Sequence, residues 1–214
     1  MQIKWFGQSS FLLTSQKGTR VLIDPYDRFL GYRMPTMEVD AVAVTHEHRD
    51  HNQIRVALGH YSLVNQPKEY TVSDVQIKGV KTFHDKENGA KRGENIVFVI
   101  QMDGLTICHC GDLGHLLTEA QLAGIGKVDV LLVPAGGRMV LGGEDAARVV
   151  KQLQPAVTVP MHYRTRALGL AGLLFEKVDT FLAAVGQKTA KAKVLEVTPE
   201  NVRNFEGVIT LQYE

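Results

Sequence analysis

The chain has 214 residues, enough for one large domain or two small ones with a substantial buried core. Hydrophobic residues make up 44% and charged residues 22% of the chain, a balance that excludes an intrinsically disordered protein. The 24 basic and 23 acidic side chains give a formal net charge of +1, which argues against nucleic acid as the main partner, because such proteins usually carry a clear basic excess.

Targeting and membrane-spanning segments are not indicated. Residues 1–6 enter a strand-like pattern at once, without the basic stretch, apolar stretch and cleavage site of a signal peptide. The apolar runs are far shorter than the ~20 residues that cross a bilayer. The only two cysteines, Cys108 and Cys110, do not indicate a disulfide framework. We therefore expect a cytoplasmic protein with no membrane partner.

The first half of the chain predicts β-strands separated by polar turns. The expected strands are Gln2–Phe6, Ser10–Thr14, Arg20–Ile23, Asp40–Thr45, Asp74–Phe83, Asn95–Met102 and Leu105–Cys110. Asp103-Gly104 joins the last two strands and is a strong signal for a hairpin turn.

The second half alternates between helix and strand. Thr118 and Gln121 have the spacing of a capping box and predict a helix over Thr118–Ile125. Gly186 is placed to end the last helix. The other expected elements are strand Val128–Pro134, helix Glu144–Leu153, strand Ala156–Pro160, helix Gly172–Val185 and strands Lys193–Val197 and Val208–Leu211. Strands first and βα units later predict an α/β (α+β) fold, with sheets packed together and helices outside. No linker divides the chain, so one domain over residues 1–214 is expected.

A dense cluster of potential metal ligands follows the strand expected at residues 40–45. Its motif, His-x-His-x-Asp-His, contains three of the eight histidines in the chain. Imidazole nitrogen and carboxylate oxygen suit zinc, iron, manganese and related ions. Alternate side chains of a loop can turn to one point, so His46 and His48 are expected to share one ion, and Asp50 and His51 to serve a neighbouring one. Two ions with open positions need about seven or eight ligands, so others must come from elsewhere.

Three further candidates each follow an expected strand: His84, Asp112 and His162. Sites in sheet proteins gather at strand ends, because the loops there are free to converge. Taken alone, His84 could be structural and Asp112 could cap a turn through its side chain. Beside the cluster, a ligand role is favoured for all three.

The order of these motifs resembles that of the metallo-β-lactamase fold superfamily. Within it, the chain is most similar to the bacterial branch that includes ascorbate-6-phosphate lactonase and many uncharacterised metal-dependent hydrolases. The likeness spans nearly the whole chain. The segments that carry it, besides the cluster at residues 46–51, are Phe6-Gly7-Gln8-Ser9-Ser10, Ile23-Asp24-Pro25, Gly111-Asp112-Leu113-Gly114-His115 and Pro160-Met161-His162-Tyr163.

The resemblance implies a four-layer αββα sandwich of two mixed β-sheets flanked by helices, with the site at one edge between the sheets. It also implies a binuclear centre with a complete set of ligands. These are His46, His48 and His84 for a first ion, Asp50, His51 and His162 for a second ion, and Asp112 as a bridge between the two.

Several other residues have two possible interpretations. Arg164 and Arg166 follow His162 closely, so they are candidates for binding an anionic substrate, with a solvated surface as the alternative. His109 is expected to be structural, and His115 could either support the site or lie in solvent. Asp24 is expected to form structural hydrogen bonds near the site.

Two apolar features remain. Cys108 and Cys110 share one face of a strand, where core packing is favoured over metal binding. The loop Pro25–Val39 is rich in aromatic residues and methionines. It could cover the site or take part in a subunit contact, and the contact is slightly favoured.

The predicted function is a metal-dependent hydrolase, in which water activated by two ions attacks a small, anionic ester, lactone or phosphoester. Zinc is the favoured metal, with manganese, iron and nickel as alternatives, and Asp50 is expected also to orient the nucleophile. Alternatives are a phosphodiesterase or nuclease, a di-iron redox centre, and a non-catalytic metal-binding protein, against which the complete ligand set argues. The expected partners are a small-molecule substrate and further copies of the chain, not nucleic acid.

Overall fold

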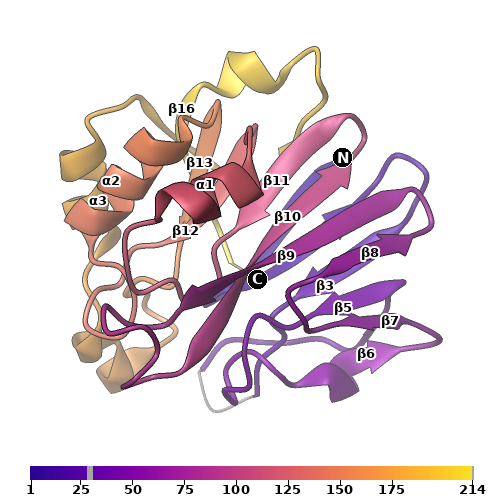
Figure 1. Ribbon diagram of the computed structural model, residues 1–214, viewed down its shortest axis with the longest axis horizontal. Coiled ribbons are helices and arrows are strands. Elements are labelled where there is room, and N and C mark those ends of the chain that lie inside the picture. The colour runs from indigo at the N-terminus through magenta and orange to yellow at the C-terminus, as the bar shows by residue number, and fades with distance from the viewer. Residues whose placement is uncertain (28–30, 214) are drawn as a thin grey trace.

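The computed structural model describes residues 1–27 and 31–213, in which two mixed β-sheets pack face to face (Figure 1). The order of the six-stranded sheet is β15 (Val194–Glu196), β1 (Gln2–Gly7), β2 (Ser10–Thr14), β3 (Arg20–Ile23), β5 (Ala41–Ala43) and β7 (Ser62–Val64). The order of the eight-stranded sheet is β14 (Thr189–Ala192), β16 (Gly207–Leu211), β13 (Val157–Met161), β12 (Val130–Pro134), β11 (Leu105–His109), β10 (Glu94–Met102), β9 (Val75–Phe83) and β8 (Glu69–Val72). A separate short pair joins β4 (Met37–Glu38) to β6 (Ala57–Leu58).

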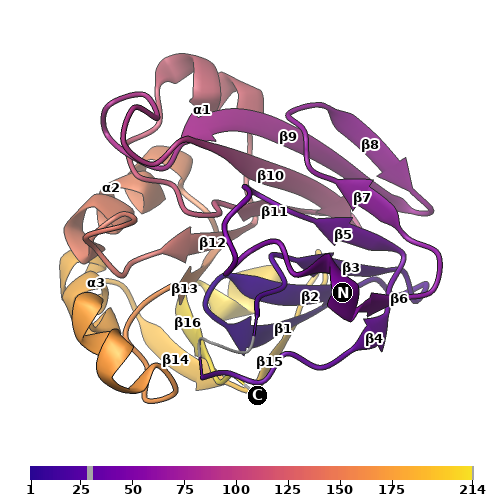
Figure 2. The same cartoon turned by 90° about the horizontal axis from the view of Figure 1, so that it is seen from below.

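Helices complete the sandwich. The outer face of the eight-stranded sheet carries α1 (Glu119–Ile125), α2 (Gly143–Leu153) and α3 (Val178–Val185) (Figure 2). The outer face of the six-stranded sheet is covered by the loop after β3, by the short 3-10 helix η2 (Ile54–Val56) and by Leu168 and Phe175, which flank the 3-10 helix η3 (Gly169–Leu174). A third 3-10 helix, η4 (Val202–Phe205), packs against β13. The expected αββα sandwich is confirmed, and no helix among the described residues is long and apolar enough to cross a membrane.

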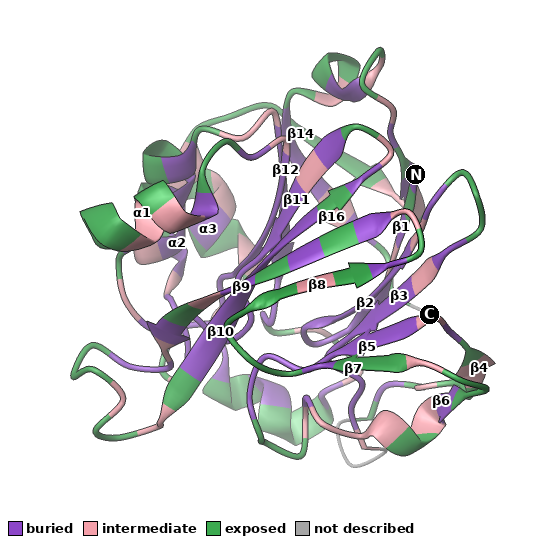
Figure 3. Ribbon diagram, turned by 45° about the vertical axis from the view of Figure 1, so that its right-hand side comes forward, coloured by how far each residue is buried: buried purple, intermediate pink, exposed green. Residues whose placement is uncertain are grey.

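The strands of the six-stranded sheet divide their side chains between two apolar clusters. Trp5 and Phe11 point into the core between the sheets, whereas Phe6 and Leu12 face the outer cluster. This alternation follows from the two-residue period of a strand. All of β12 is buried, as expected for a parallel strand with both faces covered. Figure 3 shows the opposite case in β9, where buried and exposed residues alternate along much of its length.

Three local predictions are confirmed. Thr118 accepts a hydrogen bond from the Gln121 backbone, and the Gln121 side chain accepts one from the Thr118 backbone, which completes the capping box of α1. Asp103 and Gly104 have φ angles of 51° and 75°, as a tight hairpin turn requires. Gly186 ends α3 with a φ of 62°.

The continuous helix predicted over Gly172–Val185 is wrong. The chain forms η3, then an extended residue at Phe175, and only afterwards α3. Glu176 explains the break, because its backbone N–H donates to Gly136 O at 2.7 Å and its carbonyl accepts from Arg164 N at 2.8 Å. Its carboxylate also accepts a hydrogen bond from Gly143 N at the start of α2. These contacts outweigh the helical periodicity of the local sequence.

The strands β4, β6, β7, β8 and β14 were not expected. Most are short and partly exposed, so they lack the apolar pattern by which strands are recognised.

The loop after β3 packs mainly within the chain. The Tyr26 hydroxyl donates to Phe6 O at 2.5 Å, and the Tyr32 hydroxyl lies 2.5 Å from the Thr165 hydroxyl. Both tyrosines are buried against Leu168 and Phe175. The subunit contact favoured from the sequence is therefore wrong for these two residues, whereas the Phe29–Leu30 part of the loop lies outside the described residues.

Candidate metal centre

The candidate ligands converge because four strands end at one edge of the sandwich. β9, β11 and β13 run in the same direction, since β10 is antiparallel to both β9 and β11, and β11, β12 and β13 are parallel. The loops after these strands supply His84, Asp112 and His162. The loop after β5, in the other sheet, supplies the cluster at residues 46–51. The site therefore lies where the two sheets meet, as the resemblance implies.

All seven candidate ligands fall into two adjoining groups. Within each group, one donor atom per residue lies within 4.8 Å of the donor atoms of the other members. The first group is His46, His48 and His84, and the second is Asp50, His51, Asp112 and His162. Five members are buried, Asp50 is half-buried, and His48 is the single exposed one.

The carboxylate of Asp112 lies between the two groups. Its Oδ2 atom is 3.9 Å from His46 Nε2 and 3.0 Å from His84 Nε2, which belong to the first group. The same oxygen is 3.3 Å from the Nε2 atoms of His51 and His162, which belong to the second. One carboxylate oxygen thus faces imidazoles from both groups, the position that a bridging ligand requires.

The unpaired nitrogen atoms fit divalent ions. His46 Nε2 and His51 Nε2 are buried and make no hydrogen bond with any described residue. Leaving a buried polar atom unpaired costs about 1–3 kcal/mol, and ligation of an ion would satisfy it. Imidazole nitrogen with carboxylate oxygen is also the donor set that zinc and similar ions prefer.

A hydrogen-bond network behind the ligands orients one imidazole from each group. Asp24 Oδ2 accepts from His51 Nδ1 at 2.8 Å and from the Thr45 hydroxyl at 2.7 Å. The Thr45 hydroxyl in turn lies 3.0 Å from His46 Nδ1. Because each Nδ1 is engaged by this network, Nε2 of both rings is left to face Asp112. The structural role expected for Asp24 is confirmed.

The charges of the site are strongly coupled. Burial lowers the pKa of His46 to about 3, so this ring is neutral. Desolvation opposes protonation of His51, but the carboxylates of Asp112 and Asp24 raise its pKa well above 6.5. Desolvation likewise opposes ionisation of Asp112, yet His162 and His51 hold its pKa well below the usual value. The bridge position therefore carries a negative charge at neutral pH.

Gln8 is part of the site, although the sequence analysis names it only within the segment Phe6-Gly7-Gln8-Ser9-Ser10 and not as a site residue. Its side chain is 1% exposed, and Nε2 donates to Asp50 Oδ2 at 3.1 Å and lies 2.6 Å from His162 Nε2. The backbone carbonyl of Gln8 accepts hydrogen bonds from Trp5 Nε1 and from the His162 backbone N–H. Gln8 and His162 both have a positive φ, of 50° and 52°, a strained conformation for residues other than glycine. A polar residue in the turn between two apolar strands was the available signal.

Two further histidines, His109 and His115, act as structural supports. His109 is fully buried, its Nε2 lies 2.8 Å from Ser9 O, and its Nδ1 accepts from Gly111 N. It therefore ties the turn after β1 to the loop of Asp112, and the structural role expected for it is confirmed. His115 Nε2 accepts from Phe83 N, next to His84.

The structure confirms the prediction for the two cysteines but does not test the one for the two arginines. Cys108 and Cys110 are buried in the core, as predicted, and their mutual contact and burial raise the pKa of Cys110. Arg164 and Arg166 are exposed on the loop after β13. Their guanidinium groups make no hydrogen bond or ion pair with any described residue, so their substrate role stays a prediction.

The chain is similar to one family of known proteins and to several metal-dependent hydrolases. Residues 2–162 match the model of the family described as "Beta-lactamase superfamily domain". The chain is 29% identical over 195 residues to the UPF0173 metal-dependent hydrolase of Thermococcus kodakarensis, covering 77% of this chain and 85% of that one. It is 30% identical over 233 residues to that of Pyrobaculum neutrophilum, covering 94% and 99%.

A solved structure extends the comparison. It is that of a candidate Zn-dependent hydrolase of the metallo-beta-lactamase superfamily from Thermotoga maritima, with a TM-score of 0.83 and 34% identity. The match covers 100% of this chain and 99% of that one. The chain therefore belongs to the beta-lactamase superfamily. The enzyme class expected from the sequence, a metal-dependent hydrolase of this superfamily, is confirmed.

Proposed function

We propose that this superfamily member hydrolyses a small, anionic ester, lactone or phosphoester with two divalent ions. The first ion is held by His46, His48 and His84, the second by Asp50, His51 and His162, and Asp112 bridges both. The observation that carries the proposal is the position of Asp112 Oδ2, 3.0–3.9 Å from imidazole nitrogens of both groups.

When bound, the two ions supply a Lewis acid and lower the pKa of a water molecule towards about 7, so that it attacks near neutral pH. Zinc is the proposed metal, since histidine nitrogen dominates the donor set, and manganese, iron or nickel are the alternatives. The proposal also includes the chemical class of the substrate. It includes as well that the chain is related to the bacterial lactonase branch that its motifs resemble.

The residues of the chain keep the reacting groups in place. Asp50 accepts a hydrogen bond from Gln8 Nε2 and is 3.5 Å from His51 Nε2. Although desolvation opposes it, His51 lowers the pKa of Asp50 and keeps the carboxylate ionised. An ionised carboxylate at the half-buried edge of the second group suits the role proposed for Asp50, which is to orient the attacking water.

Nucleic acid is not the proposed substrate, because the net charge of +1 provides no basic excess. Tight RNA or DNA binding that weakens steeply with salt would contradict this.

We propose in addition that the chain forms homo-oligomers in the cytoplasm. A monomer in sedimentation analysis at micromolar concentration would contradict the assembly.

The proposed function is tested by the Asp112→Ala variant. We expect purified wild-type protein to contain close to two ions per chain by elemental analysis, and Asp112→Ala to lose most of its metal and its hydrolysis, because one oxygen serves both groups. Activity is sought among lactones, phosphodiesters and phosphorylated sugars with each candidate metal. The control is Asp179→Ala, an exposed carboxylate on α3. Full activity and metal content in Asp112→Ala would refute the two-metal reading.

A further inference from the structure

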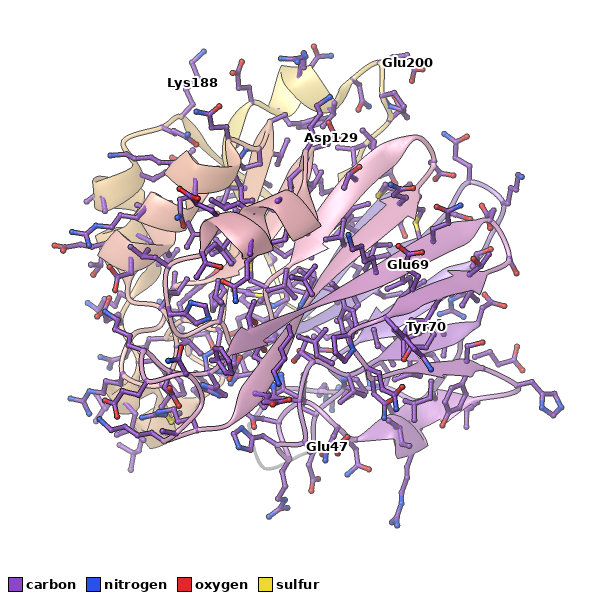
Figure 4. The ribbon with its side chains drawn as sticks, in the orientation of Figure 1. Glu47, Glu69, Tyr70, Asp129, Lys188 and Glu200 are labelled. Carbon is purple, nitrogen blue, oxygen red and sulfur yellow. The ribbon has the colours of Figure 1, made fainter. Side chains whose placement is uncertain are left out.

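A cleft of about 500 Å³ opens beside the first ligand group. His46 and His48 form one side of it, and the ends of β9 and β10 with the residues after β7 form the rest. Its volume falls within the roughly 300–1,000 Å³ of small-molecule sites. His48 is exposed, so the first group reaches solvent on the side of the cleft. Glu47, on the same rim, is labelled at the lower edge of the molecule in Figure 4.

The charged side chains that line the cleft are not all paired. Lys81 forms an ion pair with Glu94, and the Glu47 carboxylate accepts a hydrogen bond from Asn52 Nδ2 at 3.0 Å. Arg92 differs from them. Its side chain is half-buried, and its guanidinium makes no hydrogen bond or ion pair with any residue that the structure describes. An unpaired guanidinium in a cleft is suited to an oxyanion, which it can grip with two parallel hydrogen bonds.

The backbone holds Arg92 in a defined position relative to the metal centre. Asp85, directly after the candidate ligand His84, accepts from Arg92 N at 2.8 Å. The other donors to the same carboxylate are the backbone N–H groups of Glu87, Gly89 and Lys91. His84 N also donates to Gly93 O at 3.1 Å. Because the loop 85–93 is tied to His84 at both ends, the backbone of Arg92 is placed in advance of binding.

We propose that this cleft binds the anionic part of the substrate, and that Arg92 is the residue that recognises it. The substrate class is a small organic phosphate or carboxylate whose scissile bond reaches the ligand groups from the His48 side. This deepens the proposed function and rests on it. Arg164 and Arg166 do not line the cleft, so they represent a competing location for the anion.

The test measures anion binding rather than turnover, because the natural substrate is not identified. Phenylphosphonate and benzoate are titrated calorimetrically into zinc-loaded and chelator-treated protein. We expect Arg92→Gln to weaken the binding of at least one probe about tenfold or more, as loss of a charge-assisted contact predicts, with unchanged zinc content. Arg92→Lys should recover only part of the affinity, because an amine cannot form the paired contact. The matched control is Arg203→Gln, an exposed arginine on η4 that does not line the cleft.

The outcomes separate this inference from the proposed function. Preference for phenylphosphonate would assign a phosphate group, and preference for benzoate a carboxylate. Arg92-dependent binding to the metal-free protein would support the anion site even if no hydrolysis were found. Wild-type affinity in Arg92→Gln, or no binding of either probe by the wild type, would overturn the inference. So would loss of binding in Arg164→Gln or Arg166→Gln in its place.

Discussion

At the scale of single residues, the site depends on hydrogen bonds behind the ligands as much as on the ligands themselves. Asp24 is fully buried with a φ of 47°, and its carboxylate accepts from His51 Nδ1 and from both the backbone and hydroxyl of Thr45. A strained backbone at such a residue persists only where the surrounding contacts determine it. One carboxylate thereby influences a ligand in each group.

Asp24→Asn tests this role. An amide in place of the carboxylate points N–H groups at the donors of His51 and Thr45, so both ligand groups should be misoriented. We expect metal affinity to fall by about 10–100-fold, the usual cost of losing such a partner. Metal titration with a chromogenic chelator measures it. Asp74→Asn, on the turn between β8 and β9, is the control and should leave the affinity unchanged. Equal affinity in the two variants would contradict the role.

Metal affinity should also rise with pH. Because the folded-state pKa of His51 is raised well above 6.5 and that of His84 is also raised, an incoming ion must displace their protons. In the metal-free protein, protonation of these rings stabilises the fold fully below the unfolded pKa of 6.5, and this contribution is lost as pH rises through the raised pKa. Metal binding has the opposite dependence.

Zinc calorimetry in buffers of different ionisation enthalpy measures the protons released. We expect release near neutral pH and affinity that increases between about pH 6 and pH 8. A pH-independent affinity with no proton release would show that these imidazoles are already neutral in the metal-free protein.

At the scale of elements, loops with little space between them set the positions of the ligands. A Cβ atom at Gly136, after β12, would lie 2.0 Å from His162 O. One at Gly114 would lie 2.4 Å from the backbone of His84. The backbones of the loops after β11 and β12 therefore touch the backbones that carry ligands, and only glycine permits this approach.

Gly136→Ala should displace His162. Because the obstructing atom is backbone, we expect a loss of about 1–3 kcal/mol in the free energy of unfolding, as overpacking usually costs, and weaker binding of the second ion. Gly124→Ala, in the helix α1, is the matched control. Its added Cβ would lie 3.6 Å from the Val80 side chain, which is an ordinary van der Waals contact. That change should be neutral or stabilising by up to about 1 kcal/mol. Urea unfolding and metal titration of both variants decide, and equal stability would refute the steric argument.

At the scale of the whole molecule, one continuous core joins the two sheets and the helices. The cluster that contains Trp5 of β1 also contains Phe98 of β10 and Val149 of α2. Shared burial of this kind couples the parts of a chain, so that they unfold together.

We therefore expect residues 1–214 to unfold as a single domain. Trp5 is the only tryptophan and is fully buried in the six-stranded sheet, so its fluorescence reports that sheet. Far-UV circular dichroism reports all elements, including the helices on the other sheet. The two denaturation curves should coincide in chelator-treated protein, where bound metal does not complicate the transition. Separate midpoints would show two units and contradict the prediction.

Local residue patterns are sufficient to identify which residues offer metal-binding chemistry and which strands they follow. The cluster at residues 46–51, with His84, Asp112 and His162, was visible because ligand types and strand periodicity are local properties. The capping box of α1 and the turn at Asp103-Gly104 were predictable for the same reason.

The other groups that contact these ligands are evident only once the chain is folded. Gln8 lies 154 positions from His162 and Asp24 lies 27 from His51, and nothing in their local sequence states those contacts. The break before α3 depends on Glu176 reaching Gly136 and Gly143. The local sequence does not distinguish Arg92 from other surface arginines, and only the folded chain brings it to the same cleft as His48. Long-range contacts of this kind arise from packing of the whole chain, which local residue patterns do not encode.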